Sequence, residues 1–438
     1  GLIVEDVSGT DFSEYITKTV FTPLGMNDSS FDMPARLMER CAAGYEYRGD
    51  RQVRVPFDSL LQMAPAGSLI STPADMAKFM IMHLSPGGQG GRRVLSARSA
   101  AVIQRRHFSH HPAMDGVCYD FFESTLNSRR GLYHTGSWQG CSAMLYLIPG
   151  SDLGIFIAAN ARSHAFLFDL VREFHDRFFP EIYAAPAVKA GLPDSAALVS
   201  GSYRDIQYSR TTVEKIASLM GRVRVKKAGA GAIEIMFPSE GKNSSRWVQV
   251  DERLYQRTDR RELVFFDGAG SEPPSRMMKG AFVYERVGRH ETAPVQAALF
   301  VLSLAFSAAV AMGLPLFVRR LRERKPGGDV LSAIPGHYLV IVTVNGWLSF
   351  VGLGGLLLSF VLMDPFVFTR GMPAIFTAFL AMLTLGALLT LAQGFYLMKL
   401  WKNVSDRPRW EWILPLITLL FVLNALFLSS WNLLGLKM

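Results

Sequence analysis

The pattern of hydrophobic and polar positions divides the chain into three parts. The first mixes strand-like runs with helical patterns, the second contains short alternating runs, and the third contains four long apolar runs. In the first part, two apolar runs, Cys141 to Ile148 and Leu153 to Ala159, are separated by a Pro-Gly-Ser-Asp turn. Runs of this length around such a turn indicate a β-hairpin in the middle of a sheet.

Helical patterns flank this hairpin in the sequence. Thr72 is placed to cap a helix that begins at Pro73 and carries Asp75 in its first turn. A second helical pattern covers 162–179, and the run 117–123 has the composition of another strand in the same sheet. These elements predict an α/β domain, in which residues 32–60 form a polar surface connection.

The second part follows a linker at 186–193 and is typical of a small antiparallel barrel or sandwich, because short alternating runs are separated by Gly, Asn, Ser and Asp turns. No catalytic constellation is visible in it. Its clustered basic residues, Arg222, Arg224, Lys226 and Lys227, are expected to form a solvated face rather than a nucleic-acid site. The runs are 199–203, 223–225, 233–237, 247–250, 263–266 and 281–284.

The third part predicts a membrane domain of four helices. Each of its apolar runs is long enough to span a bilayer, for which roughly 20 residues are needed, and none carries a charge in its interior, which argues against an ion or proton path. The polar residues Asn345, Gln393 and Asn424 are expected to make hydrogen bonds between helices. The runs are 294–318, 338–363, 375–397 and 412–433.

Orientation follows from the basic residues of the connecting loops, which favour the cytoplasm. The first and third loops are rich in Lys and Arg, whereas the second contains only Arg370. We therefore predict that 319–337 and 398–411 are cytoplasmic. The first two parts of the chain would then lie on the extracytoplasmic side of the cell membrane, with the lipid bilayer as a partner.

Composition adds little to this picture. The formal net charge of +9 includes two basic loops and does not call for a nucleic-acid partner. Three cysteines are too few and too dispersed for a disulfide framework. His107, His110 and His111 could in principle ligate zinc, but no Asp, Glu or Cys lies beside them at ligand spacing, so a loop is the favoured interpretation. No metal and no cofactor are predicted.

The stretch Tyr133-His134-Thr135-Gly136-Ser137-Trp138-Gln139-Gly140 carries a family resemblance. His134-Thr135-Gly136 resembles the Lys-Thr-Gly box of the serine β-lactamase and penicillin-binding protein superfamily. The nearest branch contains class C β-lactamases, D-aminopeptidases and esterases, in which His can replace Lys. Two further segments, Thr22 to Met26 and Ala66 to Met76, resemble family elements and occur in the family's order.

The resemblance implies acyl transfer by an activated serine. It assigns one oxyanion donor to the N–H of Ser137, a hydrogen bond to the substrate's carboxylate or carbonyl to Thr135, and the place of the box lysine to His134. Gly136 and Gly140 would leave the backbone open to a ligand. A histidine with an ordinary pKa near ~6.5 is mostly neutral at pH 7, unlike lysine, so peptidase or esterase activity on a small-molecule or peptide acyl substrate is favoured over β-lactam hydrolysis.

The family's Ser-x-x-Lys and Tyr-x-Asn boxes are expected upstream of Gly1, because the segment matching the start of this chain follows them in the family. Within the chain, Ser-x-x-Lys occurs only at 239–242, in a turn of the second part, and Tyr-x-Asn does not occur. The nucleophile, its lysine and the tyrosine are therefore predicted to be missing from an N-terminally truncated chain, which alone would be inactive.

Together these observations predict a multi-domain protein. A partial β-lactamase-like serine hydrolase domain would cover 1–185, a lipocalin-like β-barrel accessory domain 194–288, and a transmembrane domain 293–436. The favoured function is a membrane-anchored extracytoplasmic serine hydrolase acting on cell-envelope or small acyl substrates. Two alternatives remain at this point: a non-catalytic binding or sensing module of the envelope, and a transporter or signalling protein whose membrane helices carry the function.

Overall fold

The computed structural model describes residues 1–56, 64–85, 94–241, 243–324, 336–363, 367–368, 371–402 and 412–435. The chain divides into two compact units, which are described separately. Unit 1 contains residues 1–203 and 223–286. Unit 2 contains residues 204–222 and 287–438. The connection between two strands of the barrel therefore belongs to the second unit.

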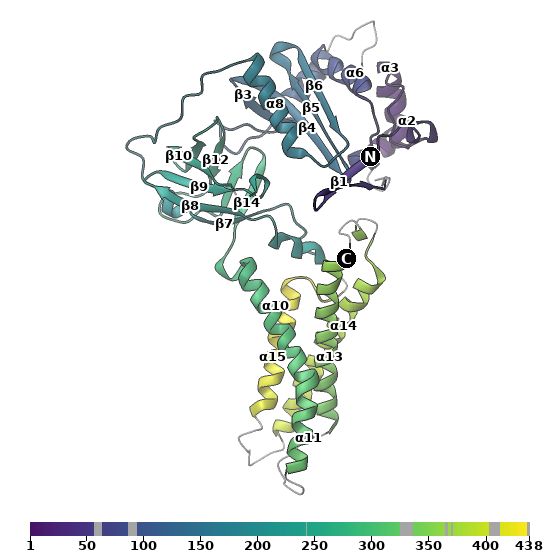
Figure 1. Cartoon of the computed structure of the whole chain (residues 1–438), viewed down its shortest axis with the longest axis vertical. Helices are drawn as coiled ribbons and strands as arrows, with labels where there is room; N and C mark the ends of the chain where they lie inside the picture. Colours follow the sequence, from purple (N-terminus) through teal and green to yellow (C-terminus); the bar gives the residue numbers. More distant parts are fainter. Residues whose placement is uncertain are drawn as a thin grey trace. The chain divides into compact units, whose positions relative to one another are not determined.

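The centre of unit 1 is a four-stranded antiparallel sheet in the order β3-β4-β5-β6 (Figure 1). The predicted hairpin is confirmed as β5 and β6, which are joined by the short 3-10 turn η3 (Pro149–Ser151). The predicted strand at 117–123 differs, because Val117 makes only isolated bridges and the strand begins at Phe122. The strands are β3 (Phe122–Leu126), β4 (Arg129–Trp138), β5 (Cys141–Ile148) and β6 (Leu153–Ala159).

Alternating residues of β5 build a core on each face of this sheet. Leu145 and Leu147 pack with Met76 and Met80 of α6 (Pro73–Leu84). Met144, Tyr146 and Ile148 pack on the other face with Leu167 and Val171 of α8 (His164–Phe178). The period of two along the strand thus places one helix layer on each side.

The N-terminal helices begin at local capping signals. The Asp11 side chain accepts hydrogen bonds from the N–H groups of Ser13 and Glu14, and Thr72 caps α6 through the N–H of Asp75, as the sequence predicts. A hairpin of β1 and β2 lies within 32–60, the range that was expected to be a polar surface connection. The remaining elements are α1 (Leu2–Ser8), α2 (Phe12–Ile16), the π-helical turn η1 (Thr17–Phe21), α3 (Thr22–Leu24), α4 (Ala35–Met38), β1 (Gly44–Arg48), β2 (Arg51–Val55), α5 (Ala64–Gly67) and α7 (Ala97–Gln104).

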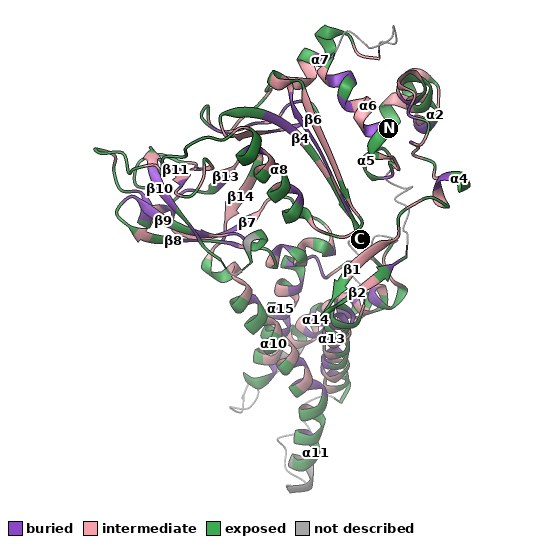
Figure 2. Ribbon diagram, turned by 45° about the horizontal axis from the view of Figure 1, so that its top comes forward, coloured by how far each residue is buried: buried purple, intermediate pink, exposed green. Residues whose placement is uncertain are grey.

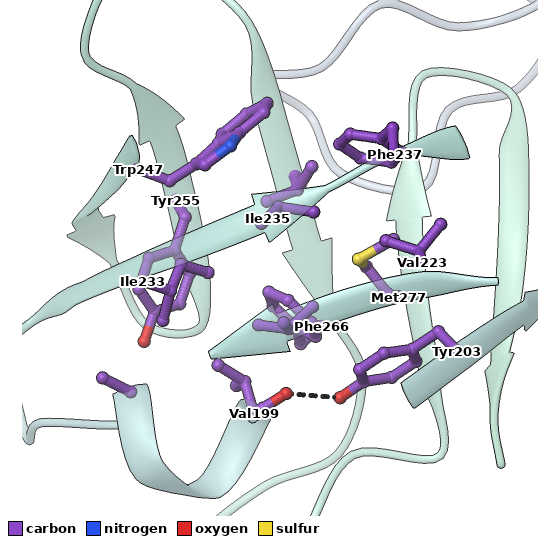
Figure 3. Packing of buried hydrophobic residues seen from close by; sticks show 13 residues of the cluster. Val199, Tyr203, Val223, Ile233, Ile235, Phe237, Trp247, Tyr255, Phe266 and Met277 are labelled. Carbon is purple, nitrogen blue, oxygen red and sulfur yellow. Dashed lines mark hydrogen bonds between the residues drawn. The ribbon is translucent and has the colours of Figure 1, made fainter. Parts of the chain in front are cut away.

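The second part of the chain forms a closed eight-stranded antiparallel barrel, which resolves the choice between barrel and sandwich. Its interior is filled by side chains with 0% exposure, among them Tyr203, Trp247, Tyr255 and Phe266 (Figure 3). The Tyr203 hydroxyl donates to the carbonyl of Val199 at 2.6 Å. The strands are β7 (Gly201–Asp205), β8 (Val223–Gly229), β9 (Ala232–Met236), β10 (Ser245–Asp251), β11 (Leu254–Arg257), β12 (Leu263–Phe266), β13 (Arg276–Lys279) and β14 (Phe282–Arg286), with short helices α9 (Ala196–Val199) and η5 (Pro238–Glu240).

Unit 2 contains four helices long and apolar enough to cross a membrane, as predicted. The first is interrupted by a π-helical segment, and residues 314–320 after it are largely exposed (Figure 2). Several predicted features lie outside the described residues. They are residue 436 of the predicted domain, part of both basic loops (with Lys325, Arg407 and Arg409), and Arg370 of the second loop. The helices are α10 (Ala293–Ala308), η7 (Ala309–Gly313), α11 (Leu314–Arg324), α13 (Gly336–Leu362), α14 (Ala374–Lys402) and α15 (Ile413–Ser430), preceded by η4 (Val213–Leu219) and η6 (Arg289–Glu291).

Two of the three polar residues in these helices make the predicted contacts. Asn345 Nδ2 donates to Thr390 Oγ1 at 2.9 Å between α13 and α14. Asn424 Oδ1 accepts from the hydroxyl of Ser303, which joins α15 to α10. Gln393 differs: it is fully buried, and neither polar atom of its side chain has a hydrogen-bond partner among the described residues.

Candidate active site

The predicted box lies on β4, at a place where that strand loses one neighbour. Pairing with β3 ends at Phe122↔Tyr133, whereas pairing with β5 continues to Trp138↔Cys141. In the described part of the chain, no strand pairs with the other side of β4 from His134 to Trp138. Alternate residues of an edge strand turn both main-chain groups outward, so this edge offers N–H and C=O groups to a ligand.

The register assigns the predicted site residues to the two faces of the sheet. His134 is opposite Leu145, and Thr135 is opposite Met144. Residues directly opposite each other share a face. Since Leu145 packs with the α6 layer and Met144 with the α8 layer, His134 lies on the face of the N-terminal helices and Thr135 on the face of α8. The two side chains therefore border the free edge from opposite faces.

Exposure along the edge agrees with accessibility to a ligand. His134, Gly136 and Ser137 are exposed, and Thr135 is half-buried. A Cβ atom added at Gly136 would meet nothing within 4 Å, so the backbone there is open, as predicted. Gly140 differs, because a Cβ there would lie 2.5 Å from Val55 Cγ2 and 2.8 Å from Gly44 Cα. The β1–β2 hairpin occupies the space that the sequence analysis left for a ligand.

An aromatic row borders the free edge at its β3 end. The Phe122 ring stacks on the His134 ring with centroids 6.1 Å apart, and on the Phe282 ring of the barrel with centroids 6.0 Å apart. Phe122 also lies 5.6 Å from the ring of Tyr133. Burial raises the pKa of Tyr133 to about 12, so its hydroxyl stays protonated at neutral pH. The barrel thus contributes an apolar side chain beside the site.

The two flanking segments of the family resemblance meet in the structure. Ser30 and Ile70 pair through both main-chain hydrogen bonds, at 3.0 and 2.9 Å. The ammonium of Lys78 donates to the carbonyl of Gly25 and, at 2.8 Å, to Asp75 Oδ1. These contacts hold the Thr22–Met26 segment against the first turns of α6.

Asp75 is the centre of this arrangement. Its Oδ2 accepts from the N–H of Asp28 at 2.8 Å and from the hydroxyl of Ser29 at 3.0 Å. Burial alone would raise the pKa of Asp75, but the hydrogen bonds from Lys78, Asp28 and Ser29 and the charge of Lys78 outweigh it and lower the pKa. The carboxylate therefore stays ionised. Ser68, in the same segment, is 1% exposed, and its hydroxyl has no partner among the described residues.

A buried carboxylate that the sequence analysis did not identify holds the beginning of β3. Glu123 accepts from Arg106 Nε, from Arg130 Nε at 2.6 Å and from the N–H of Gly116 at 3.0 Å. Burial alone would raise the pKa of Glu123, but these hydrogen bonds and the charge of Arg106 outweigh it and lower the pKa. This cluster holds the first residues of β3 in place, and β4 has a free edge from His134 onward because its pairing with β3 ends at Phe122. Its members are spread along the sequence without a periodic pattern, so no local signal indicated it.

The three histidines considered as metal ligands have other contacts. His107 Nε2 lies 2.8 Å from the carbonyl of Val102, and its ring stacks on Tyr119 with centroids 3.8 Å apart. His111 Nδ1 accepts from the N–H of Ala113 at 3.2 Å. Over the described residues, no group of three His, Cys, Asp or Glu side chains has the geometry to hold a metal ion.

Comparisons with known proteins match the part of the chain that contains this stretch of β4. The beta-lactamase family model matches residues 1–174. The chain is 29% identical over 221 residues to "Penicillin-binding protein 4" of Amycolatopsis lactamdurans, which covers 46% of this chain and 56% of that protein. It is 23% identical over 168 residues to "Protein flp" of Staphylococcus aureus (strain N315), covering 37% of this chain and 32% of that protein.

Among solved structures, a class C beta lactamase from Rhodobacter sphaeroides aligns with a TM-score of 0.33 and 20% identity, over 39% of this chain and 57% of that one. The chain spans about half the length of the first curated relative that it matches. Residues 1–174 therefore form a beta-lactamase-like domain, which this chain joins to an eight-stranded antiparallel barrel and four candidate membrane helices.

Proposed function

We propose that the whole protein is a membrane-anchored serine hydrolase that performs acyl transfer, of peptidase or esterase type, on the extracytoplasmic side of the membrane. One observation carries the proposal: in a beta-lactamase-like domain, the predicted box lies on the stretch of β4 that has no second neighbour. A free edge with exposed main-chain groups can hold an acyl substrate in extended form beside a nucleophile.

In this proposal the residues of the chain bind and stabilise. The N–H of Ser137 donates to the oxygen that becomes negative when a serine attacks the substrate carbonyl. The Thr135 hydroxyl donates to a carboxylate or carbonyl of the substrate. His134 occupies the position of the box lysine on the face of the N-terminal helices. The nucleophile and its base would belong to the family's Ser-x-x-Lys and Tyr-x-Asn boxes.

The side of the membrane is part of the proposal. The basic residues at the end of α11 and in the loop after α14 favour the cytoplasm, and this orientation would put the segment before α10 outside. A cysteine introduced at Ser332, which lies outside the described residues, tests it in a background without Cys41, Cys118 and Cys141. We expect no labelling of intact cells by an impermeant thiol reagent, and labelling after the cells are opened. Labelling of intact cells would show that this loop is extracytoplasmic and that the proposed orientation is wrong.

The activity is tested on the full-length protein in its membrane. We expect covalent labelling by a fluorophosphonate probe and hydrolysis of an activated ester. Thr135→Val, which removes a hydroxyl and keeps the β-branched shape, should lower turnover about tenfold, the effect of one lost hydrogen bond of about 1.4 kcal/mol. Thr17→Val, the same change at an exposed position of η1, is the matched control.

Three outcomes are informative. Chain 1–438 alone should not be labelled, because loss of a nucleophile costs a factor on the order of 10⁶ in such sites. If the folded full-length protein bound acyl ligands but showed neither labelling nor turnover, the protein would be a binding module of the envelope and not a hydrolase. Unchanged turnover in Thr135→Val would show that β4 is not the substrate edge.

A further inference from the structure

The barrel packs against the segment that leads into β3. Met114 of this segment is 2% exposed and belongs to one apolar cluster with Met278 of β13 and Val283 of β14. The ring of His111 lies 5.2 Å from the ring of Phe265 on β12. All these residues belong to unit 1. The contacts therefore hold the start of β14 at a defined position beside the beta-lactamase-like domain.

Phe282, the first residue of β14, lies between this contact and the free edge of β4. Its ring is inclined by 24° to the ring of Phe122, with centroids 6.0 Å apart. The ring of Phe122 is inclined by only 13° to the ring of His134, with centroids 6.1 Å apart. Phe282 is 38% exposed, Phe122 is half-buried and His134 is exposed. The aromatic row of these three residues is therefore accessible to a ligand.

The register places Phe122 on the same face of the sheet as Thr135. Phe122 is directly opposite Tyr133, and residues opposite each other share a face. Tyr133 and Thr135 are two residues apart on β4, so their side chains lie on one face, about 6.8 Å apart along the strand. A ligand paired with the free edge would continue the line of β3, which begins at Phe122. The group that Thr135 binds would thus lie next to the aromatic row.

The roles of Ser137 and Thr135 orient a substrate along this edge. The reacting carbonyl lies at the N–H of Ser137, and a substrate carboxylate lies at Thr135, nearer to Phe122. In a peptide, the terminal carboxylate belongs to the residue that is released when the last bond is cleaved. The side chain of that released residue is therefore the part of the substrate closest to the aromatic row.

We propose that the aromatic row binds an aromatic side chain on the carboxyl-terminal residue that the enzyme releases, and that Phe282 of the barrel is a specificity-determining residue. This inference rests on the proposed function, from which it takes the orientation of the substrate. Aromatic rings attract one another in offset or edge-to-face contacts at centroid separations of about 4.5–7 Å. A substrate ring beside Phe122 and Phe282 can make such contacts with both.

The experiment compares two esters that differ only in the released group. They are the ester of N-acetylglycine with phenyllactate and the ester of N-acetylglycine with lactate, each as both enantiomers. Both carry the carboxylate, and hydrolysis releases N-acetylglycine and the hydroxy acid from each. For the full-length protein in detergent, we expect a kcat/KM for the phenyllactate ester that is higher by about fivefold or more, because only this ester brings an aromatic ring.

Phe282→Ala should raise KM for the phenyllactate ester about fivefold and leave its kcat unchanged, because a ring away from the reacting carbonyl contributes equally to binding of substrate and transition state. KM for the lactate ester should not change. Phe282→Leu, which keeps an apolar side chain without a ring, should have a smaller effect. Phe178→Ala, the same change at a 59% exposed position of α8, is the control and should change neither KM.

Equal rises in KM for both esters in Phe282→Ala would mean that Phe282 only supports the fold beside the site, and unchanged KM values would mean that it does not contact the substrate. Either result overturns the proposal. Turnover by the wild type without preference for the phenyllactate ester would also overturn it, and would leave the hydrolase function in place.

A binding measurement separates this proposal from the hydrolase function. Binding of phenyllactate and lactate to the full-length protein is compared by ligand-observed NMR, which requires no turnover. Suppose that the protein hydrolyses neither ester, yet binds phenyllactate more tightly than lactate, and that Phe282→Ala abolishes the difference. The aromatic site would then be correct and the hydrolase function wrong. Equal binding of the two acids by the wild type would overturn the aromatic site.

Discussion

Phe122 faces Tyr133 in the last pair that β3 forms with β4, and from the next residue onward β4 has a neighbour on one side only. This single relationship creates the candidate site, because it frees the main chain at the position of the His134-Thr135-Gly136 box. Glu123, buried between Arg106 and Arg130, holds the same end of β3. The position of the site thus depends on β3, which begins only at Phe122, as much as on the residues of the box.

The first prediction concerns the charge at the box. In the full-length protein, His134→Lys should lower KM for carboxylate-bearing substrates at pH 7 several-fold, because lysine carries a permanent positive charge there that attracts the carboxylate. The matched comparison is a neutral ester with the same acyl group, for which KM should not change. The ratio of the two KM values is the measurement. An equal change for both substrates would mean that position 134 does not face the substrate carboxylate.

Two glycines of β4 provide a prediction about packing. A Cβ at Gly131 would lie 2.0 Å from the Tyr146 hydroxyl oxygen, whereas a Cβ at Gly136 would meet nothing within 4 Å. Gly131→Ala should therefore lower the free energy of unfolding by about 1–3 kcal/mol, the cost of overpacking. Gly136→Ala should leave it nearly unchanged. Denaturant unfolding of both variants measures the difference, and equal losses would contradict the register of the strand.

The hairpin and the membrane helices were predictable because their signals are local. The run Cys141 to Ile148 is apolar except for Ser142, as expected of a strand covered on both faces, and each membrane helix is recognisable from its own composition. Gly136 was also correctly expected to be open. These features depend on residues close together in the sequence, which a periodic pattern can detect.

Other features depend on distant partners and were not predictable in the same way. The β1–β2 hairpin is polar, with its middle residues exposed, and it is held by Tyr45 N–H donating to the carbonyl of Asn160 at 3.0 Å. Gly140 is closed by that hairpin, which no pattern near Gly140 indicates. Arg222 was grouped with the exposed residues of β8, but it ends the connection 204–222 that precedes this strand, and its Nε and Nη1 are buried.

A third prediction concerns stability and pH. His83 is 5% exposed between the rings of Phe79 and Phe121, and burial lowers its pKa to about 4. The unfolded chain binds a proton at His83 near pH 6.5, whereas the folded chain does not until about pH 4. The contribution of His83 to stability is therefore complete above pH 6.5 and is lost as the pH falls toward 4, by about 3 kcal/mol in total.

His83→Phe keeps an aromatic ring and removes the titration. Its free energy of unfolding should consequently vary less than that of the wild type between pH 6.5 and 4, measured by denaturant unfolding at several pH values. Ile81→Phe, which adds a ring at an exposed position of the same helix and removes no ionisable group, is the control and should keep the wild-type slope. A variant at His83 with the wild-type slope would show that the ring takes up protons freely in the folded state.

The last prediction compares two amides inside the membrane helices. Asn345 donates to Thr390, whereas Gln393, one helical turn along α14 from Thr390, has no partner for either side-chain polar atom among the described residues. A hydrogen bond between membrane helices contributes about 0.6 kcal/mol on average, and an unsatisfied buried amide costs free energy. Asn345→Leu should therefore destabilise the helices, and Gln393→Leu should leave them equally stable or more stable. Unfolding of the full chain in mixed micelles distinguishes the two changes, since both replace an amide by leucine. If Gln393→Leu were the more destabilising, its amide would be hydrogen-bonded in the membrane, and a water molecule or a ligand between α13, α14 and α15 would have to be its partner.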